Sequence, residues 1–243
     1  FAGVPTLIKN NTAYAGLPTQ QGSAAIPPRP AASHEAFTEE FLGTGVNILG
    51  ATTMPAFGLT ATTEFADRAP TRNPWDTDYS SGGSSGGSAA LVAAGALPIA
   101  HANDGGGSIR IPAAICGLVG LKPSRGRVEA SKETRDAPID LVSNGIVSRS
   151  VRDTARFLAD TQGFRPAPGM PPVGLVEGPG TKRLKIALIA EPLEVLAHLF
   201  GGGAGFLPQA LAQGIGRGLA RPTQVAVDLK VEVRIIMAVF SRM

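Results

Sequence analysis

Two serines in this chain lie inside glycine-rich stretches. Ser84 falls within residues 82–87, and Ser108 follows the glycines at 105–107. Glycine-rich turns let the backbone approach a substrate closely, and their N–H groups can converge on one point. A serine there could act as a nucleophile beside an oxyanion hole, because the same N–H groups stabilise a developing negative charge. We therefore expect a hydrolase whose single active site is built from both turns.

A serine hydroxyl needs a base to take its proton, and the chain offers few candidates. Its three histidines include His101, which lies too close to Ser108 in the sequence to be a natural partner. Lys9 is the alternative, because it ends an apolar run over residues 4–8 and is followed by two uncharged asparagines. A lysine buried without a carboxylate partner has a lowered pKa and can act as a base. From the residues alone, a surface lysine with its charge in water stays open.

The composition is that of an ordinary globular protein. Of the 243 residues, 43% are hydrophobic and 17% charged, which is enough to build a sizeable core. The net charge of +3 and the scattered basic residues argue against nucleic-acid binding and a membrane-surface role. No apolar run reaches the roughly 18 residues of a spanning helix, and the first residues lack the basic start of a signal peptide. A cytoplasmic location is expected, and the single cysteine, Cys116, fits a reducing compartment. The sequence indicates neither a metal nor a cofactor, and it leaves a homo-oligomer open.

Strand and helix patterns alternate along the chain. This alternation predicts an α/β fold with a mixed, mostly parallel sheet covered by helices. The expected strands are residues 4–8, 46–49, 97–100, 118–121, 184–189 and 228–239, and the expected helices before residue 150 are 34–42, 88–94 and 109–115. A further helix should follow Ser150, which forms a capping box with Asp153. The segment that leads to Ser81 is expected to be a loop, and residues 164–183 a linker.

Four segments resemble conserved parts of one known family. They are Gly82-Gly83-Ser84-Ser85-Gly86-Gly87-Ser88, Gly106-Gly107-Ser108-Ile109-Arg110-Ile111-Pro112, Cys116-Gly117-Leu118-Val119-Gly120-Leu121-Lys122-Pro123, and the opening Ala2-Gly3-Val4-Pro5-Thr6-Leu7-Ile8-Lys9-Asn10-Asn11. The first three resemble the signature of the amidase signature family, and the last is similar to the segment that carries its catalytic lysine. The chain is identified as a truncated member, with residues 1–192 as an incomplete catalytic core and residues 193–243 as a divergent tail.

The resemblance implies a triad of lysine, cis-serine and serine, with no cofactor. Ser108 would be the nucleophile, Ser84 the bridging serine that follows a cis peptide bond from Gly83, and Lys9 the base behind it. Ser85 is expected to hydrogen-bond Lys9. The oxyanion hole would consist of the N–H groups of Gly105, Gly106, Gly107 and Ser108. Arg110 would either orient the site or a substrate carboxylate, or form a structural ion pair.

The resemblance implies hydrolysis of a small carboxylic amide to an acid and ammonia or an amine. The sequence around Trp75 and Asp153 is closer to amidases of linear or cyclic amides than to the subunit that supplies ammonia for tRNA amidation. A non-catalytic or defective remnant is a second hypothesis, because similarity fades after about residue 192. Residues 82–86 also match the nucleophile elbow of α/β-hydrolases, but no apolar strand precedes them. Neither G-x-G-x-x-G nor the P-loop pattern occurs, so the glycines do not indicate a phosphate site.

Overall fold

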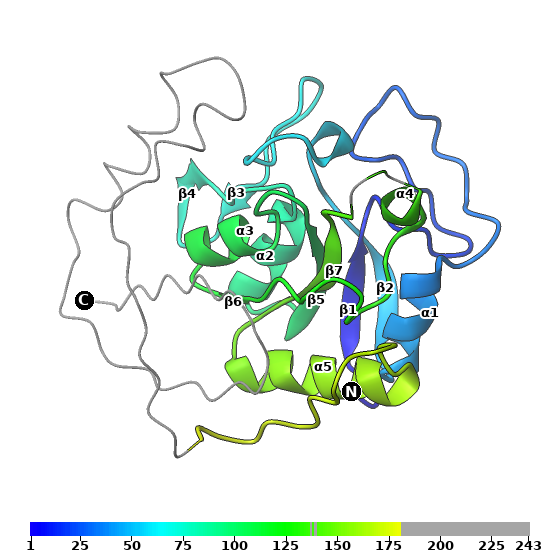
Figure 1. The fold of residues 1–243 in the computed structure, drawn as a ribbon. Helices are drawn as coiled ribbons and strands as arrows, with labels where there is room; N and C mark the ends of the chain where they lie inside the picture. Colours follow the sequence, from blue (N-terminus) through cyan, green and yellow to red (C-terminus); the bar gives the residue numbers. More distant parts are fainter. Residues whose placement is uncertain (137, 139, 181–243) are drawn as a thin grey trace. The chain divides into compact units, whose positions relative to one another are not determined.

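A computed structural model describes residues 1–136, 138 and 140–180, and Figure 1 shows how their elements are arranged. The strands expected at residues 184–189 and 228–239 and the tail expected at 193–243 lie outside these residues. Among the helices of this described part, none has the length and apolar character needed to cross a bilayer.

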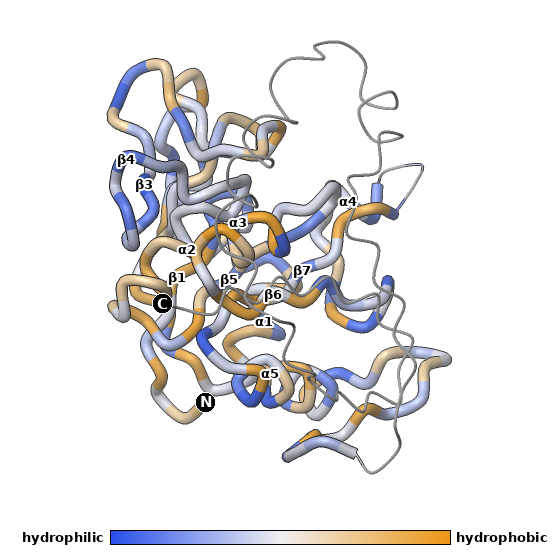
Figure 2. Tube along the Cα trace, turned by 90° about the vertical axis from the view of Figure 1, so that its left-hand side faces the viewer, coloured by the Kyte–Doolittle hydropathy of each residue, from blue (hydrophilic) through white to orange (hydrophobic). Residues whose placement is uncertain are grey.

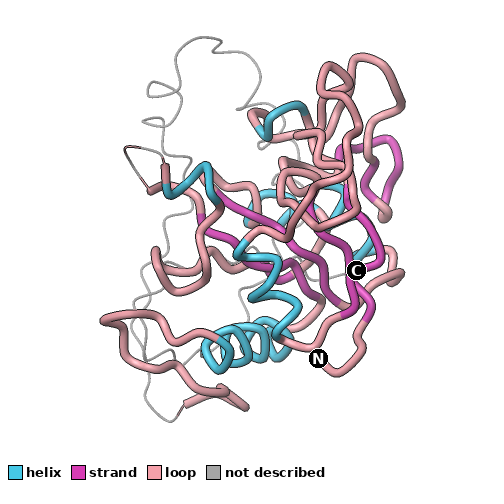
Figure 3. Tube along the Cα trace, turned by 90° about the vertical axis from the view of Figure 1, so that its right-hand side faces the viewer, coloured by secondary structure: helices cyan, strands magenta, loops and turns pink. Residues whose placement is uncertain are grey.

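The strands that carry the site belong to two hydrogen-bonded sheets. β1 (Pro5–Lys9) pairs in parallel with β2 (Asn47–Thr52). β5 (Ile99–Asp104) pairs antiparallel with β7 (Ser143–Ser148), and β7 also pairs antiparallel with the short β6 (Val119–Gly120). Figure 3 shows these strands running side by side with helices next to them.

Side-chain contacts place β1 beside β5. The Thr6 hydroxyl donates to the carbonyl oxygen of Ile99 at 3.0 Å, and the Lys9 N–H donates to Nδ1 of His101 at 3.1 Å. The order of these contacts means that β1 and β5 run in the same direction. β7 runs opposite to β2, β1, β5 and β6, so the expected mixed and mostly parallel arrangement is confirmed. Both β1 and β5 therefore end on the same side, where Lys9 and Asp104 lie.

Residues of the strands alternate between two apolar layers, as the period of two in a strand requires. Ile8, Ile99 and Ile146 belong to one core cluster, which α1 (Ala36–Gly43) and α5 (Val151–Phe164) cover with aromatic side chains. The second cluster contains Ala100, Ala102 and Val147 from the strands together with Val92, Ile109 and Ala113. It packs under α2 (Gly86–Ala93) and α3 (Arg110–Ile115), where Figure 2 shows apolar residues along α3. The expected α/β fold is confirmed.

The expected Ser150 cap at the start of α5 is confirmed, but the Asp153 carboxylate accepts from the Ser150 hydroxyl and not from its backbone N–H, so the capping box is incomplete. Ser150 accepts a hydrogen bond from the N–H of Asp153 at 3.1 Å, and its hydroxyl donates to Oδ2 of the same residue at 2.7 Å. These contacts satisfy a helical N–H group that has no partner within the helix, so α5 begins at Val151.

Part of the predicted loop before Ser81 is an antiparallel hairpin. It consists of β3 (Arg72–Asn73) and β4 (Asp76–Ser80). The indole N–H of Trp75 donates to the carbonyl oxygen of Cys116 at 2.8 Å, which attaches the hairpin to the end of α3. The loop prediction is wrong here because the residues of β4 are mostly exposed and polar and give no apolar alternation. The structure also contains three elements that the sequence did not predict. They are the strand β7, the short 3-10 helix η1 (Ala56–Gly58) and the helix α4 (Lys132–Arg135).

Candidate active site

Lys9 is the last residue of β1 and is fully buried. Its Nζ donates to Oγ of Ser84 at 2.8 Å and to Oδ1 of Asn103 at 2.7 Å. Burial lowers the pKa of Lys9 from 10.5 to about 7, although the negative charge of Asp104 acts in the opposite direction. Lys9 is thus carried into the interior, and the surface alternative is wrong. A neutral amine at this position can accept a proton near neutral pH.

Ser84 lies in the turn that leads into α2, and its side chain is buried. The peptide bond between Gly83 and Ser84 is cis, as the resemblance implies. The turn η1 comes close to this serine, since a Cβ atom built on Gly58 would lie 3.2 Å from Oγ of Ser84. The Ser84 hydroxyl is therefore enclosed between the Lys9 amine and the loop that contains η1.

The glycines of this turn are explained by close packing of the loop at residues 53–63. A Cβ atom on Gly83 would lie 2.6 Å from the carbonyl oxygen of Thr62. A Cβ atom on Gly87 would lie 2.6 Å from the backbone nitrogen of Thr53. Since real Cβ atoms do not come so close to backbone atoms, any larger residue would displace the loop and change the surroundings of Ser84.

Asn103 is a site residue that the sequence analysis missed. It is the second-last residue of β5, is buried, and its amide oxygen accepts from Lys9. The Ser85 hydroxyl donates to the backbone carbonyl of Asn103 at 3.4 Å. Its hydrogen bond is therefore to Asn103, whereas we expected one to Lys9. The available signal was a polar pair, Asn103 and Asp104, between the predicted strand and the glycines.

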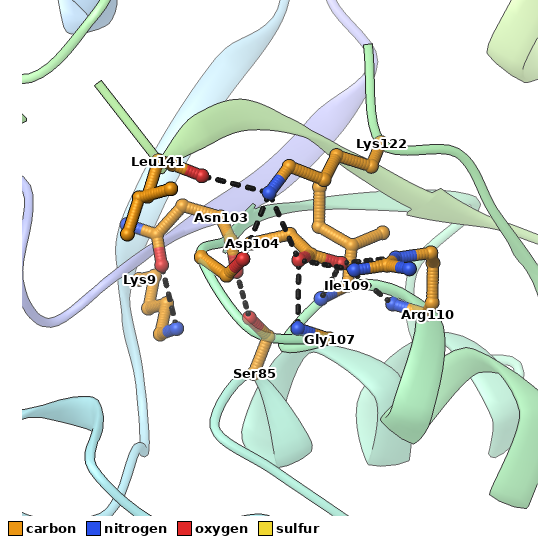
Figure 4. A network of polar contacts seen from close by, with 10 residues as sticks. Lys9, Ser85, Asn103, Asp104, Gly107, Ile109, Arg110, Lys122 and Leu141 are labelled. Carbon is orange, nitrogen blue, oxygen red and sulfur yellow. Dashed lines mark hydrogen bonds and ion pairs between the residues drawn. The ribbon is translucent and has the colours of Figure 1, made fainter. Parts of the chain in front are cut away.

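Asp104 organises the turn that contains Ser108 (Figure 4). Its buried carboxylate accepts from the N–H groups of Gly107 at 2.8 Å and Ile109 at 3.2 Å. The Arg110 side chain donates twice to it, from Nε at 2.8 Å and from Nη2 at 3.0 Å. Burial alone would raise the pKa of Asp104, but the hydrogen bonds and charge of Arg110 hold it below its usual value. Of the two roles left open for Arg110, the structure shows the ion pair.

Ser108 is half-buried and lies between the two residues whose N–H groups donate to Asp104. These flanking contacts hold its backbone in place at the end of β5. Asn103 contacts Lys9, and its neighbour Asp104 holds the residues on either side of Ser108. These two consecutive residues of β5 thus link the Lys9 site to the Ser108 turn.

The three glycines at 105–107 differ in whether their N–H groups are free to donate to an oxyanion and in how much space surrounds them. The N–H of Gly107 already donates to Asp104, which directs it toward that carboxylate. Gly106 is exposed, and a Cβ atom built on it meets no atom within 4 Å. Gly105 is half-buried, with its Cβ position 3.3 Å from the Val142 side chain. Open space therefore lies beside Gly106.

His101 supports the strand that carries the lysine. It is fully buried, its Nδ1 accepts from the Lys9 N–H, and its Nε2 lies 3.3 Å from Oδ1 of Asn144. Burial lowers the pKa of His101 to about 3, although the hydrogen bond that its ring makes to Oδ1 of Asn144 acts to raise it. The ring is therefore neutral, with Nδ1 as the acceptor and the proton on Nε2. With both nitrogens engaged, His101 does not act as a base for either serine. Within the described residues, no group of three or more His, Cys, Asp or Glu side chains could hold a metal ion.

Comparison with known proteins identifies similar sequences. The family model described as Amidase matches residues 1–196. A putative amidase, AmiC, of Mycobacterium leprae is 52% identical over 194 residues, which cover 80% of this chain and 42% of that protein. The 6-aminohexanoate-cyclic-dimer hydrolase of Paenarthrobacter ureafaciens is 42% identical over 171 residues, covering 68% of this chain and 35% of the relative.

The fold is likewise similar to that of solved amidases. A bacterial aryl acylamidase of the amidase signature family superposes with a TM-score of 0.60 at 40% identity, over 65% of this chain and 33% of that one. The chain spans less than half the length of these relatives. The family match, the relatives and the shared fold lead to one conclusion: the chain belongs to the amidase signature family.

Proposed function

We propose that this chain carries the catalytic centre of an amidase that hydrolyses carboxylic amides through an acyl-enzyme on Ser108. The observation that supports this most directly is the contact between Lys9 and Ser84, in which a buried amine with a pKa of about 7 lies 2.8 Å from a buried hydroxyl.

The proton path begins at neutral Lys9. Its lone pair takes the proton of the Ser84 hydroxyl, and Ser84 takes the proton of Ser108 as that oxygen attacks the amide carbon. The Asn103 oxygen accepts one N–H of the amine, which directs the lone pair toward Ser84. This path needs Lys9 neutral, and burial provides that state near pH 7.

Acylation forms the bond from Ser108 to the carbonyl carbon and breaks the C–N bond. The proton held by Lys9 returns through Ser84 to the leaving nitrogen, which departs as ammonia or an amine. The negative oxygen of the intermediate is stabilised by the N–H groups of Gly105, Gly106 and Ser108. Gly107, which we also expected to contribute, donates instead to Asp104. Water then attacks the ester by the same proton path and releases the acid.

We propose a small-molecule amide as the substrate. The 6-aminohexanoate-cyclic-dimer hydrolase relative supports a linear or cyclic amide. The nucleophile-elbow hypothesis has no support, because Ser84 is enclosed beside Lys9 and His101 is engaged with Lys9 and Asn144. The cytoplasmic location, a homo-oligomer and the division between residues 1–192 and 193–243 stay predictions.

The test is covalent labelling of the chain with a fluorophosphonate, followed by mass spectrometry to locate the adduct. The expected adduct is on Ser108, with labelling slowed by several orders of magnitude in Lys9→Ala. Thr6→Val is the matched control, because Thr6 makes a buried polar contact from the same strand without touching either serine. An adduct on Ser84 contradicts the assigned roles, and a folded chain that takes no label favours the defective remnant.

A further inference from the structure

Lys122 reaches from the segment after β6 to the turn that contains Ser108 (Figure 4). Its Nζ donates to the carbonyl oxygen of Gly105 at 2.8 Å and to that of Leu141 at 2.7 Å. The same atom lies 3.6 Å from Oδ1 of Asp104. One ammonium group thus joins the end of β5, the following turn and the segment before β7.

The Lys122 ammonium interacts mainly with the two carbonyl oxygens. Arg110 already neutralises Asp104 with two hydrogen bonds of 2.8 and 3.0 Å. Lys122 lies farther from that carboxylate than from either carbonyl oxygen. A charged donor makes stronger hydrogen bonds than a neutral one, so its hold on the Gly105 carbonyl is firm.

Holding this carbonyl fixes the direction of the next N–H group. The only cis peptide bond among the described residues is Gly83–Ser84, so the bond between Gly105 and Gly106 is trans. In a trans peptide the C=O and the following N–H point in opposite directions. The N–H of Gly106 therefore points away from Lys122. Without such a contact, a peptide between two glycines could rotate at little steric cost.

We propose that Lys122 is a positioning residue for the oxyanion hole, holding the Gly105 carbonyl so that the Gly106 N–H faces the reacting oxygen. The proposal rests on the proposed function of Ser108. Gly106 suits the role because it is exposed beside open space, whereas the N–H of Gly107 is taken by Asp104. Lys122 contacts no substrate atom in this role and acts through the backbone.

The test measures the rate of Ser108 phosphonylation at several fluorophosphonate concentrations, which separates reversible binding from the covalent step. Lys122→Met should slow the covalent step about 10- to 100-fold, the range expected when a transition-state donor is misplaced. The reversible binding constant should be unchanged, because the hole acts mainly on the developing charge. A general loss of structure would change both.

Arg149 provides the matched control. Its guanidinium also donates to two backbone carbonyls, those of Val92 and Leu97, but it lies away from the turn that contains Ser108. Arg149→Met should leave both constants unchanged. If Lys122→Met does not fold, Lys122→Gln replaces it and should show the same selective loss in the covalent step.

Chemical rescue adds a second readout. Lys122→Cys should be slow, and alkylation with 2-bromoethylamine, which rebuilds an ammonium side chain of nearly the same length, should restore the rate. Methylthiolation of the same cysteine adds no charge and should not. Cys116 does not interfere, because it is buried and burial raises the pKa of its thiol to about 12.

The outcomes separate this proposal from the one it rests on. If wild-type Ser108 reacts and Lys122→Met reacts at the same rate, the role of Lys122 is refuted while the proposed function stands. Equal losses in Lys122→Met and Arg149→Met, or no rescue by aminoethylation, also refute it. If wild-type Ser108 does not react, the proposed function falls and the role of Lys122 falls with it.

Discussion

Replacing Asn103 by aspartate should raise the pKa of Lys9 and shift the pH dependence of Ser108 labelling. The Asn103 amide oxygen lies 2.7 Å from Nζ, so Asn103→Asp places a negative charge at that distance. An opposite charge this close stabilises the ammonium and raises a lysine pKa by roughly 1–3 units. From about 7, the midpoint should move to roughly 8–10.

The size of the effect follows from the fraction of neutral lysine. At pH 7 about half of the Lys9 side chains are neutral in the wild type, against roughly 10% down to 0.1% in Asn103→Asp. Labelling at pH 7 should therefore slow by about 5- to 500-fold and recover as the pH rises above the new midpoint. The sign follows from the base role, since protonated Lys9 cannot accept a proton from Ser84.

The assay is the second-order rate of Ser108 modification between about pH 5.5 and 10.5. Asn73→Asp is the control, because Asn73 is also buried but its side chain donates to the carbonyl oxygen of Ile115. Its profile should keep the wild-type midpoint. If Asn103→Asp lowers the rate equally at every pH, with the midpoint unchanged, Lys9 is not the titrating base and the reasoning fails.

Two further predictions concern stability. Burial raises the pKa of Glu40 to about 8, so between about pH 4.5 and 8 the folded state keeps a proton that the unfolded state has lost, and the free energy of unfolding falls. Glu40→Gln keeps an oxygen to accept the Glu129 N–H and should remove this fall. It should stabilise the protein at pH 9 by on the order of 5 kcal/mol, as measured by urea denaturation at both ends of the range. In α5, Ser150→Ala should lower the free energy of unfolding by about 1 kcal/mol, because it removes the helix cap. Gly163→Ala should raise the free energy of unfolding by about 0.5–1 kcal/mol, because alanine favours the helix and its Cβ meets no atom within 4 Å. Thermal unfolding of the two variants should shift in opposite directions, and shifts of the same sign would contradict this account.

The strands and helices that the sequence predicted correctly have regular apolar patterns. The run before Lys9 predicted β1, and Ser150 marked the start of α5. From the residues alone the burial of Lys9 stayed open, and the structure shows it. β7 was missed because its sequence includes serine, asparagine and glycine, which have low strand propensity. It forms a strand because β5 and β6 pair with it on both sides, and this long-range pairing leaves no local pattern.

The candidate site could be predicted in its reactive groups but not in the contacts that hold them. Lys9, Ser84 and Ser108 are chemically distinctive and lie in recognisable motifs. Asn103 and Asp104 are ordinary polar residues in a sequence. The role of Asn103 depends on β1 lying beside β5, because this brings Lys9 to its amide oxygen. Asp104 contacts residues of the turn that follows it, and these contacts are visible only once the turn has formed. The same holds for Lys122, whose contacts to the Gly105 and Leu141 carbonyls follow only from the fold.

The distance along the chain between Lys9 and its partners has a consequence for folding. Lys9 and Asn103 are 94 positions apart, and Lys9 and Ser84 are 75 apart. In a chain that has not yet brought β1 beside β5, Lys9 is solvated with its ordinary pKa near 10.5, and the serines have no base. The loop-closure entropy of such long-range contacts must be overcome before they form, so we expect them to form late in folding. Serine reactivity should therefore appear only when the core is complete, so that an incompletely folded or nascent chain stays chemically inert and labelling reports on the final folding step.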